Sequence, residues 1–264
     1  MLVEKISKSK LQIINSLKQK KNRKELGLFV AEGQKCVTDT INSFELYMLI
    51  ATGEWIDDNI ISQSYKNISI EGKLYNASRQ EISKVSSLST PPDVIAVYRM
   101  PEPNSSKWEK DITNRLTIVL DGIQDPGNLG TIIRSADWFG VHHILASKTT
   151  VDLFNAKTIQ ATMGAISRVK ILYDDIKTIL MKYPDLPVYG TLLDGENIYS
   201  ADLKQKGFII FGNEGKGITD SLRKLVTESL FIPSYPKGVN TSESLNVAMA
   251  ATITLAEFRR RLQS

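Results

Sequence analysis

The sequence predicts an α/β protein in which a small α/β unit precedes a larger unit built on a mostly parallel sheet. After Leu116, short apolar runs alternate with helical stretches, a pattern typical of parallel strands covered by helices on both faces. Residues 1–98 contain a shorter mixture of apolar runs and helical patterns. Between them, MPEPNSSKWEKD has the proline, serine and charge content of a linker. We therefore expect domains at residues 1–100 and 113–264, joined by a linker at 101–112.

The first unit should begin with a helix, because Leu11, Ile14 and Leu17 recur at spacings of three. The lysine-rich stretch KQKKNRKELG is expected to break this helix. The elements expected after it are a strand at LFVAEG, a helix at Gln34 to Ile41, a strand at FELYMLIA, strands at 67–70 and 94–98, and a helix at SRQEISKVSS between those two strands.

The second unit should contain six strands, at LTIVL, HHILA, RVKIL, PVYGTL, GFIIFG and SLFIP. Ligands of such sheets lie beyond the carboxyl ends of the strands, so the segments that follow the strands are the candidate sites. The segment 231–247, FIPSYPKGVNTSESLNV, combines a strand end, a loop and a helix expected to be capped by Ser242 or Ser244. Backbone N–H groups in such an arrangement can face a ligand.

Composition narrows the class of protein. The chain has 264 residues, of which 42% are apolar and 23% charged, and these globular values argue against disorder, coiled coil and collagen. No stretch has the length of a membrane span, and the start MLVEKISKSK lacks an apolar signal core. We expect a cytoplasmic protein. With only Cys36, His142 and His143 as Cys and His residues, we expect no disulfide, zinc site or other metal.

Positive charge is concentrated at the start of the chain. Residues 1–35 contain nine Lys or Arg and three Glu, a balance of +6, which leaves −2 for the rest of the chain. Such a segment is typical of a polyanion-binding surface for RNA or DNA phosphates. The alternative is a solvated helix face. The candidate phosphate-binding residues are Lys20, Lys21, Arg23 and Lys24.

The segment 121–140 carries the first candidate polar residues. The turn Asp125-Pro126-Gly127-Asn128 leads into an apolar helix that Asn128 can cap, with Arg134 about one and a half turns further on. The simpler interpretation is a capped loop followed by a surface arginine.

Two later segments carry the remaining candidates. In FGNEGKGI, three glycines surround Glu214 and allow close approach of a ligand to the backbone. This is not a P-loop, because Ile218 stands where lysine is required, and a tight turn is the alternative. In the third segment, Ser244 and Asn246 stand two apart at the start of the last helix. Capping alone explains Ser244 but explains Asn246 less well.

These segments resemble a known family. DPGNLGTIIRSADWFG, FGNEGKG and IPSYPKGVNTSESLNVA, in this order, are similar to the three motifs of the SpoU (TrmH-type) RNA ribose 2′-O-methyltransferases. Residues 1–98, with LKQKKNRKELGLFVAEG, resemble the ribosomal-protein-L30e-like substrate-binding domain that precedes the catalytic domain in many members. The resemblance implies transfer of a methyl group from S-adenosylmethionine to a ribose 2′-hydroxyl, a deep C-terminal trefoil knot, and a homodimer.

The resemblance also implies roles for individual residues. The functional polar positions of the family match Asn128, Arg134, Glu214, Ser244 and Asn246. The positions around the cofactor match Thr191, Leu192, Gly212, Ile232 and Leu245. The chain departs from many members in reading SLNVAMA where they have SLNVS, but all five polar positions are kept.

Arginine is a poor general base, because its pKa lies above about 12. We therefore expect Arg134 to bind the phosphate next to the target ribose and to stabilise the developing alkoxide, with Asn128 and Ser244 orienting it. Glu214 is expected to take the proton or to hold Arg134.

The expected substrate is 23S ribosomal RNA, because the L30e-like domain suits a ribosomal RNA loop better than the short extensions of tRNA enzymes. The alternatives are a tRNA methyltransferase and a non-catalytic RNA-binding or ribosome-assembly factor on the same fold. DNA is not an expected partner. A Rossmann-type base methyltransferase is disfavoured by the missing glycine fingerprint.

Overall fold

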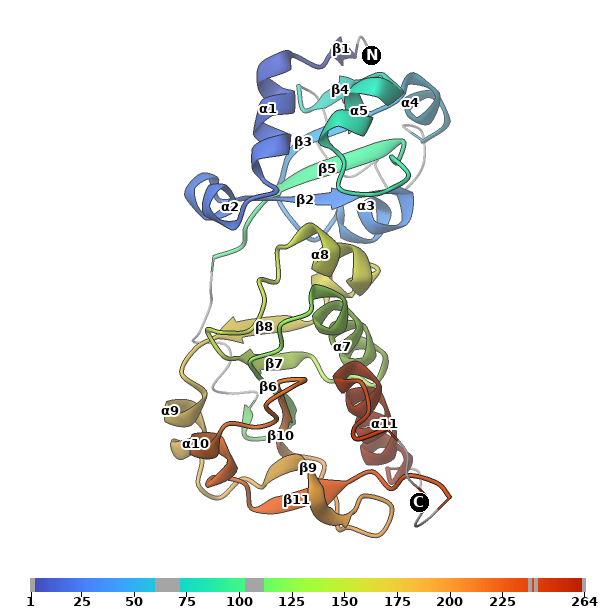
Figure 1. Cartoon of the computed structure of the whole chain (residues 1–264). Helices are drawn as coiled ribbons and strands as arrows, with labels where there is room; N and C mark the ends of the chain where they lie inside the picture. Colours follow the sequence, from blue (N-terminus) through green and yellow to red (C-terminus); the bar gives the residue numbers. More distant parts are fainter. Residues whose placement is uncertain (1–2, 60–71, 103–111, 237–238, 240–241, 263–264) are drawn as a thin grey trace. The chain divides into compact units, whose positions relative to one another are not determined.

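The structure is a computed structural model that describes residues 3–59, 72–102, 112–236, 239 and 242–262. It divides into two compact units (Figure 1). The first unit comprises Met1–Glu102 together with Asp152–Ser167, and the second comprises Pro103–Val151 and Arg168–Ser264. Most of the expected linker, and the strand expected at 67–70, lie outside the described residues.

The first unit is built on a sheet with strand order β1-β4-β3-β5-β2. Strand β5 runs antiparallel to β2 and β3, whereas β4 runs parallel to β3 and β1. The elements are β1 (Glu4–Lys5), α1 (Lys8–Ser16), α2 (Lys20–Leu26), β2 (Leu28–Glu32), α3 (Gln34–Thr40), β3 (Leu46–Ala51), α4 (Gly53–Asn59), β4 (Leu74–Asn76), α5 (Arg79–Val85), β5 (Val94–Arg99), α8 (Ala156–Thr162) and the 3-10 helix η3 (Ala165–Ser167).

The segment 152–167 completes the core of the first unit, although the neighbouring stretches of the chain belong to the second. Helix α8 contacts β2, and the ring of Phe154 lies 4.7 Å from the ring of Phe29. A Cβ added at Gly164 would lie 2.4 Å from the Cβ of Asp39, and Gly164 has φ +86°. Glycine is therefore required where this segment crosses α3.

The basic stretch forms a helix of its own, so the expected break is short. Helix α2 ends at Gly27, whose φ of +63° is the left-handed conformation typical of helix C-termini. Lys20, Lys21 and Lys24 are exposed, as phosphate-binding residues must be.

The environment of Arg23 argues against its expected role as a phosphate-binding residue. Its side chain is buried, and its guanidinium donates to the Asp152 carboxylate at 2.6 Å and to the carbonyl of Leu17 at 2.8 Å. A guanidinium with these internal partners joins α2 to the segment 152–167 and is not presented to RNA.

The second unit contains a six-stranded sheet with order β11-β9-β10-β6-β7-β8. Every strand pair in it is parallel, which confirms the predicted fold class. Its elements are β6 (Leu116–Asp121), α7 (Pro126–Trp138), β7 (His143–Ala146), β8 (Lys170–Tyr173), α9 (Ile176–Met181), β9 (Val188–Asn197), β10 (Gly207–Gly212), α10 (Asp220–Arg223), β11 (Glu228–Phe231) and α11 (Val247–Arg260).

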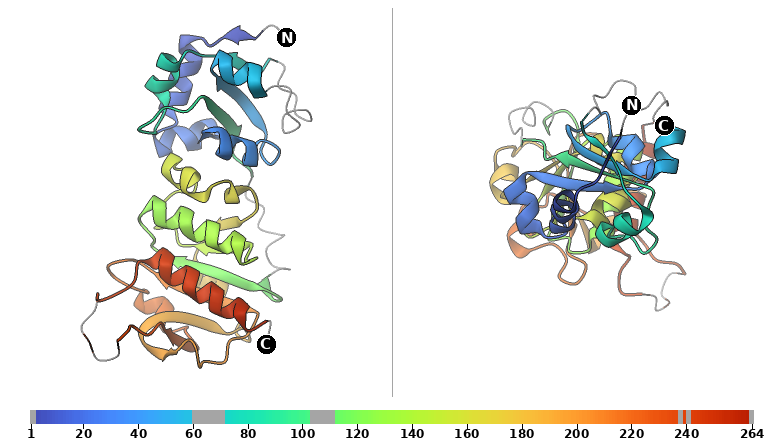
Figure 2. Two further views of the ribbon diagram at one scale, coloured as in Figure 1. Left: turned by 90° about the vertical axis from the view of Figure 1, so that its right-hand side faces the viewer. Right: turned by 90° about the horizontal axis from the view of Figure 1, so that it is seen from above.

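Helices cover both faces of this sheet. Helices α9 and α10 share one apolar core with the strands, in which Ile176 and Leu222 pack with Val119 and Phe208. Helices α7 and α11 lie side by side (Figures 1 and 2), joined by a hydrogen bond between Ser135 and Thr252. None of the helices in the described part of the chain is long and apolar enough to span a membrane.

The end of α11 is held by two loops. Arg259 donates to the carbonyls of Phe139 at 2.6 Å and Gly140 at 3.1 Å, and also to the side chain of Gln205. Arg261 donates to the carbonyls of Ile198 and Ala201. The C-terminal helix is therefore fixed between the end of α7 and the segment 198–205.

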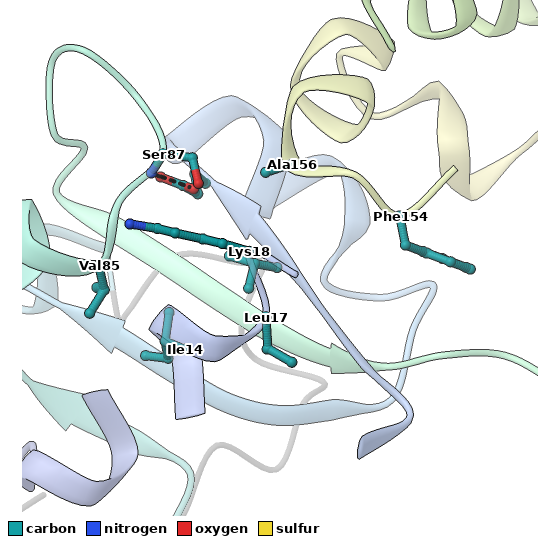
Figure 3. A pocket seen from close by; sticks show the side chains of 9 residues that line it. Ile14, Leu17, Lys18, Val85, Ser87, Phe154 and Ala156 are labelled. Atoms are coloured by element: carbon teal, nitrogen blue, oxygen red, sulfur yellow. Dashed lines mark hydrogen bonds between the residues drawn. The ribbon is translucent and has the colours of Figure 1, made fainter. Parts of the chain in front are cut away.

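The first unit contains a small pocket beside β2 (Figure 3). Its volume of about 10 Å³ is close to the least that holds one water molecule. Glu32 lines it and accepts hydrogen bonds from the Ser86 hydroxyl and the Ser87 backbone. We interpret it as a packing feature rather than a ligand site.

Candidate active site

The register of β6 and β10 determines where the first two candidate segments lie. Gly212, the last residue of β10, pairs with Asp121, the last residue of β6. The two segments therefore leave the same edge of the sheet from neighbouring strands, and this is the edge where parallel sheets bind ligands. Gly122, with φ +75°, turns the chain away from β6 toward α7.

Three of the five predicted catalytic residues form a hydrogen-bonded chain at this edge. The Asn246 side-chain amide donates to Asn128 Oδ1 at 2.9 Å, and Asn128 Nδ2 donates to Glu214 Oε1 at 3.0 Å. Each residue comes from a different sequence motif. The Asn128 amide is thereby oriented, because its oxygen accepts one bond and its nitrogen donates the other.

The structure corrects the predicted helix caps. The N-cap of α7 is Asp125, whose carboxylate accepts a hydrogen bond from the Asn128 backbone at 2.8 Å. The Asn128 side chain is thus available for the network instead of capping. In α11 the cap is Asn246 and not Ser242 or Ser244, since Asn246 Oδ1 accepts from the backbone of Ala248 at 2.9 Å. Asn246 therefore caps a helix and holds Asn128 at the same time.

Asn213 is a site residue that the sequence analysis missed. Its Nδ2 donates to the carbonyl of Gly122 at 2.7 Å, and its Oδ1 accepts from the two backbone N–H groups that follow Glu214. A Cβ at Gly212 would meet the backbone of Gly217 at 2.2 Å. The loop is thus closed tightly, and the carboxylate of Glu214 is directed to Asn128. The preference of asparagine for such turns was the available signal.

Arg134 and Ser244 are not part of this chain of hydrogen bonds. Arg134 is exposed on α7, six residues after Asn128, and six residues turn a helix by about 600°, which places the two on different faces. Ser244 is exposed in the segment that precedes Asn246. The chain by itself therefore gathers only part of the predicted catalytic set.

The predicted cofactor residue Thr191 lies where the pairing between β9 and β10 ends, and we call this place the gap between β9 and β10. Strands β9 and β10 are paired only as far as Gly190 and Ile210, and the pairing of β9 with β11 shifts from Gly190–Ser229 to Glu196–Leu230. Residues 191–195 thus lie outside the paired register of β9 and β11. The Thr191 hydroxyl still donates to the carbonyl of Ile210 at 2.9 Å. Backbone groups at the gap are left outside these ladders, which suits a ligand held through the backbone.

The other predicted cofactor residues come from the segments beside this gap. Leu192 follows Thr191 in β9, Gly212 ends β10, and Ile232 follows β11 directly. Leu245, two residues before α11, is 50% exposed. An exposed apolar side chain of this size can contact a ligand directly.

Comparison with known families agrees with the geometry. The model of the SpoU rRNA methylase family matches residues 115–256, and that of the MRM3-like substrate binding domain matches residues 8–96. The chain belongs to the SpoU rRNA methylase family, with a substrate-binding domain of the MRM3-like kind before it, and the predicted family is confirmed.

Individual relatives match along nearly the whole chain. The chain is 30% identical over 260 residues to 23S rRNA (guanosine(2553)-2′-O)-methyltransferase RlmP of Bacillus subtilis, covering 97% of this chain and 98% of that protein. It is also similar to the AdoMet-bound rRNA methyltransferase of Sinorhizobium meliloti, with 28% identity, a TM-score of 0.82, and 99% and 98% of the two chains covered. The SpoU methyltransferase AviRb of Streptomyces viridochromogenes shares the fold, at 21% identity and a TM-score of 0.82 over 98% of this chain and 99% of that one.

Proposed function

We propose that this protein transfers a methyl group from S-adenosylmethionine to a ribose 2′-hydroxyl of ribosomal RNA, with 23S RNA as the substrate, and that it acts in the cytoplasm. The observation that carries the proposal is the chain Asn246–Asn128–Glu214 at the carboxyl edge of the sheet. The activity that names the Bacillus relative, which matches along nearly the whole chain, supports the choice of 23S RNA.

The residues around the gap between β9 and β10 would hold the cofactor: Thr191, Leu192, Gly212, Ile232 and Leu245. When bound, S-adenosylmethionine supplies a methyl group on a sulfonium, which is a good leaving group. The protein must then orient the ribose hydroxyl and accept one proton.

Glu214 is the proton acceptor in this proposal. Its Oε1 accepts from Asn128, and its Oε2 lies 3.5 Å from the backbone nitrogen of Gln124. A carboxylate fixed in this way presents its remaining lone pairs to a hydroxyl in one orientation. Arg134 would bind the adjacent phosphate and stabilise negative charge on the 2′-oxygen, which suits a guanidinium better than the role of base.

A second copy of the chain would bring Arg134 to the site. Trp138 on α7 is 84% exposed and Met249 on α11 is 50% exposed, and these helices contact each other. Large apolar side chains exposed on adjacent helices are typical of an interface. We propose a homodimer through α7 and α11, in which Arg134 of each subunit serves the active site of its partner.

Heterodimers test this arrangement. Arg134→Ala and Glu214→Ala chains carrying different tags are co-expressed, and dimers with one chain of each kind are purified. If Arg134 acts across the interface, one of the two sites is complete, so we expect about half of the wild-type activity. Heterodimers as inactive as both parent dimers would show that Arg134 and Glu214 act within one chain.

The hydrogen bonds of Arg259 and Arg261 at the end of α11 support a C-terminal knot. They bind this helix both to the segment 198–205 and to the end of α7. We propose that the C-terminal part of the chain forms this knot, in which α11 lies between the end of α7 and the segment 198–205. The family resemblance gives the same expectation.

Calorimetry and a transfer assay test the function. Wild-type protein and Glu214→Gln should bind S-adenosylmethionine alike, because Glu214 lies outside the proposed cofactor residues. With an unmodified 23S transcript, Glu214→Gln should transfer methyl about 100-fold more slowly or worse, as expected for loss of a general base. Equal rates would remove Glu214 from that role. Transfer to a tRNA transcript but not to 23S RNA would show that the substrate is tRNA and that the proposal of 23S RNA is wrong.

A further inference from the structure

The second unit has an open pocket that none of the proposed catalytic or cofactor residues lines. Its volume is about 210 Å³, far above the roughly 10–15 Å³ that one water molecule needs. It lies at the carboxyl ends of β6, β7 and β8, on the side of β6 away from the gap between β9 and β10. The carboxyl edge of the sheet thus offers a second place for a ligand.

Hydrogen bonds connect the wall of this pocket to the Glu214 loop. The Ser147 hydroxyl, in the pocket wall, accepts from the backbone of Gly122 at 2.9 Å. The carbonyl of the same Gly122 accepts from Asn213, the residue before Glu214. Gln124, which donates to the carbonyl of the wall residue Thr149 at 2.7 Å, also lies beside Glu214. Hydrogen bonds through Gly122 and Gln124 thus join the pocket wall to the loop that carries Glu214.

The pocket combines cations, carboxylates and hydroxyls. Lys148 and Lys177 provide two ammonium groups, and Asp121, Asp174 and Asp175 provide three carboxylates, of which Asp121 accepts from the backbone of Thr219. Hydrogen bonds from Thr178 lower the pKa of Asp175, and the charges of Lys148 and Lys177 lower it further. Asp174 and Asp175 each accept a local backbone hydrogen bond through one carboxylate oxygen.

This combination fits one nucleotide of RNA. Ammonium groups bind phosphate, while carboxylate and hydroxyl oxygens accept hydrogen bonds from ribose 2′-hydroxyls and from base amino groups. We infer that the pocket binds a nucleotide of the substrate RNA that neighbours the methylated one, with its phosphate at Lys148 and Lys177. This inference rests on the proposed function, because it requires RNA at the Glu214 site.

The double variant Lys148→Ala/Lys177→Ala tests the pocket, with Lys170→Ala/Lys182→Ala as the matched control. The control removes the same charge from the start of β8 and the end of α9, outside the pocket. The probe is an unmodified 23S transcript. We expect the pocket variant to bind this RNA at least about 10-fold more weakly. A plot of log binding constant against log salt concentration should be less steep by about one to two units, because about one phosphate contact is lost with each lysine. Its KM for RNA should rise, and its affinity for S-adenosylmethionine should match wild type.

The possible outcomes distinguish a failure of the pocket inference from a failure of the proposed methyl transfer. If the pocket variant binds and methylates the transcript as the control does, the pocket inference is wrong and the function stands. If the wild type binds the transcript without methylating it and the pocket variant binds it more weakly than the control, the RNA pocket stands and the proposed reaction fails. Equal loss in the pocket variant and the control would reduce the effect to overall charge and overturn the inference.

Discussion

Single residues in this site perform two tasks at once. Asn246 caps α11 through its side-chain oxygen and orients Asn128 through its side-chain nitrogen. The sequence predicted the residues of this site by family resemblance and by polar type. It could not predict which side chain caps which helix, because Asn, Asp and Ser are nearly equivalent as caps and tertiary contacts select among them. Asn128, Asp125 and Ser244 illustrate that choice.

Two substitutions at Asn246 separate its tasks. Serine retains a capping oxygen but has no amide to donate to Asn128, so Asn246→Ser should keep the stability of the wild type while slowing methyl transfer about 100-fold. Asn246→Ala should slow transfer equally and also lower the free energy of unfolding by about 1 kcal/mol. Denaturant unfolding and single-turnover rates measure the two effects. Wild-type transfer by Asn246→Ser would contradict a role for the hydrogen bond to Asn128.

Burial distinguishes Arg23 from its basic neighbours. Removing one partner of a buried ion pair leaves the other uncompensated, so Arg23→Ala should destabilise the protein by about 3–5 kcal/mol. Lys24→Ala, at an exposed position of the same helix, should change stability by less than about 0.5 kcal/mol and weaken RNA binding. Thermal unfolding and filter binding at several salt concentrations test the pair. A stable Arg23→Ala variant with weakened RNA binding would restore the original prediction.

At the scale of elements, local pattern predicted the strands and the fold class well. All six apolar segments predicted as strands in the second unit are strands of its parallel sheet. Short apolar segments that alternate with helices can be buried in few architectures other than a parallel sheet covered by helices. The segment 152–167 was not predictable in the same way. Its assignment to the first unit depends on contacts with β2 and α3, which lie more than a hundred residues away in the sequence.

Gly164 tests the packing of that segment. Alanine there meets Asp39 and also requires a left-handed backbone, so Gly164→Ala should destabilise the protein by about 1–3 kcal/mol. Gly27→Ala is the matched control, because Gly27 has φ +63° with nothing within 4 Å of the added Cβ. The loss of stability in Gly27→Ala therefore measures the left-handed backbone strain alone, without a steric contact. Denaturant unfolding should show a larger loss for Gly164→Ala, and equal losses would mean that α8 is packed less closely than described.

At the scale of the whole molecule, the chain passes between the two units three times, after residues 102, 151 and 167. The substrate-binding unit is thus completed by a segment that belongs, in sequence, to the SpoU match at 115–256. A simple division of the sequence into two consecutive domains does not describe this arrangement. The reason is physical: α8 and Phe154 cover apolar surface of β2 that residues 1–102 supply.

The fate of a labelled methyl group is the sharpest test of the proposed reaction. Wild-type protein is incubated with tritiated S-adenosylmethionine and an unmodified 23S transcript, and the RNA is digested to nucleosides. We expect label on the 2′-oxygen of one ribose, and we expect this label to be lost in Asn128→Ala, which should still bind the cofactor. Label on a base, or no label in RNA although the protein binds the cofactor, would contradict the proposed reaction.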